Sequence, residues 1–131
     1  MVCMDTSFLV DLLRGKQDAI LKLEKIESDA ERITTTPISA SELFQGAYNS
    51  KNSEAEVDKV RELLKRVELL EFTVHACEKY GKLANELKSL GRKIGDLDTL
   101  IASVALSHDE PILTANVNHF SKVPGLIVRS W

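Results

Sequence analysis

The sequence is poor in cysteine and in aromatic residues, and it has no excess of positive charge. Two of its 131 residues are cysteine, and 5% are aromatic. Cys3 and Cys77 lie in apolar surroundings far apart in the sequence, so we expect buried, reduced thiols rather than a disulfide framework or a zinc site, while the sequence alone leaves a pairing between the two open. Seventeen Lys and Arg against 20 Asp and Glu give a formal net charge of −3. This balance excludes a broad basic surface for nucleic acid, although it allows a local patch.

Long apolar runs are also missing. None approaches the ~18 residues of a membrane span, and the N-terminus lacks the basic segment of a signal peptide. We therefore expect a soluble, cytoplasmic protein with no membrane partner. The 44% apolar and 28% charged content is typical of a globular chain, and the length predicts one domain over residues 1–131.

Short apolar runs alternate with longer amphipathic stretches along the chain. The runs that read as strands are 2–4, 32–36, 69–72, 111–114 and 126–128. Strands separated by helices predict an α/β fold with a central parallel sheet of about five short strands and helices on both faces. The amphipathic helices carry apolar side chains that we expect to be mostly core: Phe8, Leu9, Leu12, Phe44 and Tyr48.

Acidic and amide side chains follow the predicted strands. Asp5 ends the first strand, Glu42 lies in the helix after the second, Asp96 and Asp98 open a late helix, and Asn116 follows the fourth strand. In an open α/β sheet the carboxyl ends of the strands form the ligand-binding edge. These side chains are therefore candidates to converge on one rim.

Each acid also has a purely structural interpretation. Ser39 and Glu42 form a capping-box pattern, Asp96 and Asp5 can cap helices, and Asp98 suits a first helical turn. A cluster is harder to explain in this way, because two carboxylates ~5 Å apart repel by roughly 3 kcal/mol at an effective dielectric constant near 20. Divalent cations relieve such repulsion, and oxygen ligands favour Mg²⁺ or Mn²⁺.

Four segments of the sequence together resemble the signatures of the PIN-domain family, and in particular the VapC-type toxin ribonucleases. The segments are Met4–Ser7, Ser41–Leu43, Ile94–Ser103 and Ile112–Asn116, followed by Phe120 and Val123–Leu126. They span essentially the whole chain in the family's order. The most specific block is Asp98 with Ile101 and Ala102.

The resemblance implies metal-dependent cleavage of single-stranded RNA with Mg²⁺ or Mn²⁺. The implied metal-binding and catalytic residues are Asp5, Glu42, Asp98 and Asn116, with Asp96 as an accessory ligand. Asn116 departs from relatives that carry Asp there and implies a weakly held second metal. Ala115 stands where many relatives have Arg, which implies lower RNA affinity.

Further roles concern positioning and partners. The resemblance implies that Thr6, Ser7 and Thr114 orient Asp5 or a phosphate, and that a VapB-type antitoxin or a second copy, forming a homodimer, covers part of the apolar surface. From the residues themselves, the basic run with Arg92 and Lys93 before the late acids is a candidate to hold RNA phosphates. The run also includes Lys88, and Arg14 and Lys16 follow the first helix.

Two other interpretations compete with the nuclease. A receiver-type phosphoacceptor domain needs a Lys at the end of a late strand, and Thr114–Asn116 supplies none. A catalytically weak PIN-like scaffold that binds RNA or protein partners is compatible with Asn116, but the presence of all three acids argues against it. Among the three histidines we expect His119 to approach the site most closely.

Overall fold

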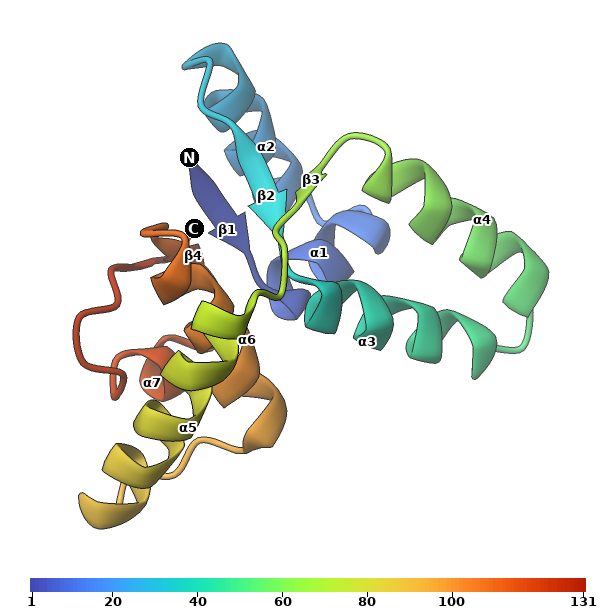
Figure 1. Ribbon diagram of the computed structural model, residues 1–131. Helices are drawn as coiled ribbons and strands as arrows, with labels where there is room; N and C mark the ends of the chain where they lie inside the picture. The colour runs from blue at the N-terminus through green and yellow to red at the C-terminus, as the bar shows by residue number, and fades with distance from the viewer.

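The computed structural model describes residues 1–131 as an α/β fold with seven helices and five strands (Figure 1). In chain order the elements are β1 (Val2–Met4), α1 (Thr6–Leu13), α2 (Gln17–Ser28), β2 (Ile33–Thr35), α3 (Pro37–Tyr48), α4 (Ser53–Leu64), β3 (Glu68–Leu69), α5 (Val74–Ser89), α6 (Asp96–Ser107), β4 (Ile112–Leu113), α7 (Val117–Phe120) and β5 (Val128–Arg129). None of the helices is long and apolar enough to cross a bilayer.

The five strands form one parallel sheet in the order β3-β2-β1-β4-β5. The predicted parallel sheet is thus confirmed, although β3 ends three residues before its expected end and β5 begins two residues after its expected start. Strand β1 is central, because Cys3 pairs with Thr34 of β2 on one side and with Ile112 of β4 on the other. Asp5, directly after β1, therefore lies at the middle of the carboxyl edge of the sheet.

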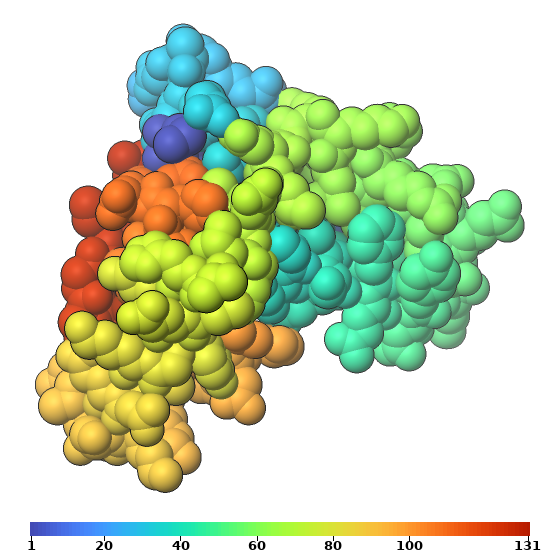
Figure 2. Space-filling model, viewed as in Figure 1, coloured from blue at the N-terminus to red at the C-terminus, as the bar shows by residue number.

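The two faces of the sheet are covered by different helices. Val2 and Met4 are buried in a core with α1, α2, α3 and α4, whereas Cys3 packs in a separate cluster with Leu70 and residues of α5 and α6. This alternation follows from the two-residue period of a strand. The α3–α4 hairpin and the α5–α6 pair form two projecting lobes, and Figure 2 shows a recess between them on the lower side of the molecule.

Threonine side chains begin two of the helices. Thr73 accepts a hydrogen bond from the Ala76 amide at the start of α5, as its position before the helical pattern predicts. Thr36 does the same for the Ser39 amide at the start of α3, where Pro37 occupies the first helical position. Helix α3 therefore begins before Ser39, and the predicted capping box of Ser39 and Glu42 is wrong. Glu42 is thereby free of a capping role.

The two thiols lie in opposite environments. Cys3 is fully buried, but Cys77 on α5 is exposed, so the expectation of two buried thiols is wrong for Cys77. Tyr48 at the end of α3 is also exposed rather than core. Both residues lie on amphipathic helices near the edge of the apolar stripe, where the sequence pattern assigns a face with least precision.

We expect a thiol titration with Ellman's reagent to separate the two cysteines. Cys77 should react at once in the native protein, whereas Cys3 should react only after unfolding. Burial, with a smaller contribution from the nearby Glu110 charge, raises the pKa of the Cys3 thiol far above its usual range. Rapid reaction of two thiols in the native state would contradict this packing.

Candidate functional site

Asp5 is a buried carboxylate at the end of the central strand. Its side chain is 3% exposed and caps helix α1. Oδ1 accepts hydrogen bonds from the Ser7 hydroxyl at 2.6 Å and from the Ser7 and Phe8 amides at 2.9 and 3.3 Å. Burial raises the pKa of Asp5, and these hydrogen bonds partly oppose that shift. Asp5 is thus a fixed oxygen donor whose negative charge is poorly solvated.

The end of β4 is tied to Asp5 through Thr114. The buried Thr114 hydroxyl donates to Asp5 Oδ2 at 2.7 Å and accepts the Asn116 amide proton at 2.8 Å. The Ala115 amide donates to the Ser7 hydroxyl oxygen at 2.9 Å. These bonds hold the backbone after β4 against the start of α1, so that Asn116 is placed beside the carboxyl edge of the sheet.

Glu42 reaches the same edge from α3. Because the helix begins at Pro37, Glu42 lies in its second turn and does not complete a capping box with Ser39. Its Oε1 instead accepts a hydrogen bond from the Thr6 hydroxyl at 2.6 Å, and Thr6 Oγ1 also lies 3.0 Å from the buried Ser39 hydroxyl. The contact joins Glu42 to the residue that follows Asp5.

The two late acids point into different surroundings. Helix α6 begins at Asp96 after Gly95, whose φ of +97° favours glycine, and no side chain caps this helix. The expectation that Asp96 is an N-cap is therefore wrong. Asp96 lines a cavity of about 290 Å³ together with Lys88 and Lys93.

Asp98 instead faces α7. Its Oδ2 lies 2.8 Å from His119 Nδ1 and 3.4 Å from Asn116 Nδ2. Residues two apart on a helix differ in direction by about 200°, which explains why Asp96 and Asp98 separate. Among the histidines, His119 contacts two candidate residues directly, as its position near Asn116 suggested.

The acids share one edge but do not form a closed cage. No group of three or more carboxylate, imidazole or thiol side chains lies close enough to hold an ion. Asp5 and Glu42 are instead connected through consecutive residues of α1, and Thr114 and Asn116 extend the connection toward Asp98. The acids therefore lie along the same edge of the sheet, but their side chains do not converge into one compact cluster.

The donors nevertheless fit a hard divalent cation. Asp5, Glu42, Asp98 and Asn116 offer carboxylate and amide oxygens, the ligands that Mg²⁺ and Mn²⁺ prefer. The buried charge of Asp5 in particular has only hydroxyl and amide donors for compensation.

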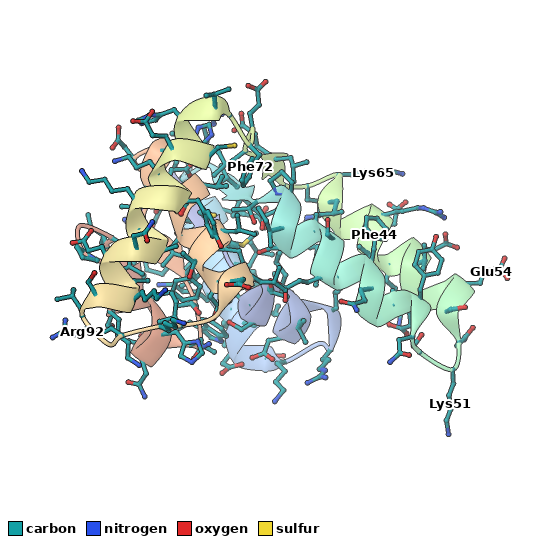
Figure 3. All side chains as sticks on the ribbon, turned by 60° about the horizontal axis from the view of Figure 1, so that its bottom comes forward. Phe44, Lys51, Glu54, Lys65, Phe72 and Arg92 are labelled. Atoms are coloured by element: carbon teal, nitrogen blue, oxygen red, sulfur yellow. The ribbon has the colours of Figure 1, made fainter.

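The basic candidates are spread over both lobes. Lys93 lies by Asp96 in the 290 Å³ cavity, and Arg14 lines a second cavity that reaches Glu42. Arg92 is exposed at the far end of α5, opposite Lys51 at the tip of the α3–α4 hairpin (Figure 3). Of the predicted phosphate-holding pair, only Lys93 lines a cavity next to the acids.

Known proteins share this fold and sequence pattern. The family model for the PIN domain matches residues 2–126. Ribonuclease VapC1 of Haemophilus influenzae is 32% identical over 98% of this chain and 96% of its own length, and the tRNA(fMet)-specific endonuclease VapC of Salmonella typhimurium is 27% identical over the same shares. The structure of VapBC2 from Rickettsia felis bound to a promoter DNA fragment superimposes with a TM-score of 0.92 at 30% identity, covering 100% of this chain and 99% of that one. The chain therefore belongs to the PIN-domain family, and within it to the VapC ribonucleases.

Proposed function

We propose that this protein is a Mg²⁺- or Mn²⁺-dependent endoribonuclease that cleaves single-stranded RNA. The observation that carries the proposal is the buried Asp5 at the centre of the carboxyl edge, joined by hydroxyl groups to Glu42 and to the end of β4. Family membership supports the reaction class, because the curated relatives are named as ribonucleases or as an endonuclease.

Asp5, Glu42 and Asp98 would hold the metal, with Asn116 as a neutral fourth donor. A divalent cation bound there supplies an activated water and stabilises the charge that develops on the phosphodiester. Ser7 and Thr114 fix both oxygens of Asp5 by hydrogen bonds, so that its carboxylate needs little reorientation on binding. Thr6 holds Glu42 toward the same edge.

Phosphates of the RNA would be bound next to the acids. Lys88 and Lys93 border Asp96 at the start of α6, two residues before Asp98. Because the protein is acidic as a whole, such local lysines are needed to lower the repulsion between the carboxyl edge and a polyanion.

A VapB-type antitoxin is the proposed protein partner, and the pair would act in the cytoplasm. The Rickettsia felis relative was solved as a VapBC complex. On this chain a groove of about 230 Å³ runs between α1, α3 and α4 and contains Val10, Leu13 and Val60 as well as Glu42. A segment bound in that groove would cover apolar surface and approach a metal-binding acid at once. A homodimer remains part of the proposal and is tested by sedimentation of the purified chain.

The decisive experiment is cleavage of defined RNA by the purified protein. We expect a fragment pattern from a tRNA pool and from an unstructured RNA with 5 mM Mg²⁺ or Mn²⁺, and none in EDTA. Cleavage products that form equally in EDTA would refute metal dependence. Binding of RNA without cleavage in either metal would instead favour the catalytically weak scaffold.

A further inference from the structure

Asp98, Asn116 and His119 bring three polar atoms together at the end of the carboxyl edge. His119 Nδ1 lies 2.8 Å from Asp98 Oδ2 and 3.0 Å from Asn116 Nδ2, and the last two atoms lie 3.4 Å apart. Nδ1 is either a donor to Asp98 or an acceptor from Asn116, but it cannot be both at once. With Nδ1 protonated, Asp98 Oδ2 accepts from both nitrogens and the trio is satisfied; with Nδ1 unprotonated, Nδ1 and Asp98 Oδ2 are two acceptors 2.8 Å apart with no proton between them.

The same three distances suit ligands of one metal ion. Two ligand atoms at right angles, each ~2.1 Å from an octahedral cation, are about 3.0 Å apart. The edges of the triangle, 2.8, 3.0 and 3.4 Å, are close to that value. Rotation of the Asn116 amide by 180° would present its oxygen in place of Nδ2 at no steric cost, since the two atoms have nearly the same size.

The backbone keeps His119 in this place. It lies on the single turn α7, between Asn116, whose carbonyl accepts the His119 amide proton at 3.2 Å, and the fully buried Phe120. Phe120 anchors the turn in the core formed with α5 and α6. The imidazole itself is 42% exposed, so it is accessible to an ion from solvent.

We propose that His119 is a metal ligand in this protein, and that its Nδ1 completes a face made with Asp98 and Asn116. This inference rests on the proposed metal-dependent function. The neutral amide of Asn116 is a weaker metal ligand than a carboxylate would be. The imidazole nitrogen of His119 would supply a stronger ligand beside it. Because an imidazole nitrogen is a better ligand for a transition-metal ion such as Mn²⁺ than for Mg²⁺, the site should prefer Mn²⁺ to Mg²⁺.

Pulsed electron paramagnetic resonance of bound Mn²⁺ tests the assignment directly. We expect the wild-type complex to show ¹⁴N modulation from an imidazole, and His119→Gln to lose it. His108→Gln is the matched control, because His108 lies at the C-terminal end of α6 and contacts the Glu71 carbonyl, away from the carboxyl edge. The modulation should survive in that control.

Metal titration provides a second measurement that is independent of cleavage. His119→Gln should weaken Mn²⁺ binding by at least about 10-fold, since even the loss of a ligand's hydrogen-bond partner costs that much, and Mg²⁺ binding much less. His119→Glu, which offers an oxygen, should restore binding and shift the preference toward Mg²⁺.

The outcomes distinguish this inference from the proposed function. If Mn²⁺ binds the wild-type protein but shows no nitrogen coupling, or if His119→Gln keeps that coupling, His119 is not a ligand while the metal site stands. If neither Mn²⁺ nor Mg²⁺ binds at millimolar concentration, the proposed metal-dependent function fails as well.

Discussion

Replacing Asp5 by asparagine should abolish metal-dependent cleavage and yet raise the melting temperature of the metal-free protein. Cleavage is lost because the central carboxylate is removed. Stability rises because burial disfavours the charged form of Asp5, and its raised pKa means that ionisation costs folding free energy at neutral pH. Asparagine caps a helix nearly as well as aspartate, so α1 should remain intact.

The measurement is thermal unfolding with EDTA and with Mn²⁺. At 100 times its dissociation constant a ligand adds about 2.7 kcal/mol, which should raise the wild-type melting temperature by about 10 °C. Asp5→Asn should show no such rise. Equal stabilisation of both proteins by Mn²⁺ would place the ion elsewhere.

The pH dependence of this variant has a definite sign. A carboxyl group whose folded pKa is raised destabilises the native state as pH increases from the unfolded value through the folded one. The stability advantage of metal-free Asp5→Asn over the wild type should therefore be absent at low pH and grow as the pH rises above about 4. An advantage that is constant with pH would indicate an effect other than the Asp5 charge.

The second large effect separates Asp98 from Asp96. We expect Asp98→Asn to lose metal-dependent cleavage by 100-fold or more, on the scale seen when catalytic metal or charge-stabilising groups are removed. Asp96→Asn should keep most activity, because Asp96 faces the lysine-lined cavity and not Asn116 and His119.

Stability gives an independent check on the same pair. Since Asp96 makes no capping hydrogen bond, Asp96→Ala should cost only its favourable interaction with the helix dipole, about 0.3–1 kcal/mol. Cleavage rates and melting temperatures of the three variants settle the roles. If Asp96→Asn is inactive while Asp98→Asn cleaves normally, the two acids have exchanged functions.

The short apolar runs that alternate with amphipathic stretches were enough to predict a parallel sheet, because strands buried on both faces need continuous apolar segments. The starts of the helices were predicted less well. At α3, both Thr36 and Ser39 are suitable caps by residue type, and Pro37 between them decides the start in favour of Thr36. At α6, Gly95 takes the capping position without a side chain, so Asp96 moves into the helix.

The candidate site was predictable in part for the same reason. Parallel strands place Asp5 and Asn116 at one edge whatever the detail of the loops. Which atoms then meet depends on side-chain directions that a linear pattern does not contain. Glu42 contacts Thr6, and Asp98 contacts His119, because of the direction in which each side chain leaves its helix. A helix that began one residue earlier or later would turn that side chain away from its partner.

The bond between Thr114 and Asp5 also has a consequence for synthesis of the chain. The two residues are 109 positions apart, so this contact closes a loop that includes nearly the whole protein. On a ribosome that adds roughly 5–20 residues per second, the first strand waits about 5–20 s for β4 to be made. Asp5 therefore lacks its Thr114 partner until translation is almost finished. A chain that stops before Ile112 leaves the central strand without a neighbour on one side. Such a fragment carries Asp5, Glu42 and Asp98 but lacks Thr114 and Asn116, which extend the connection from Asp5 toward Asp98.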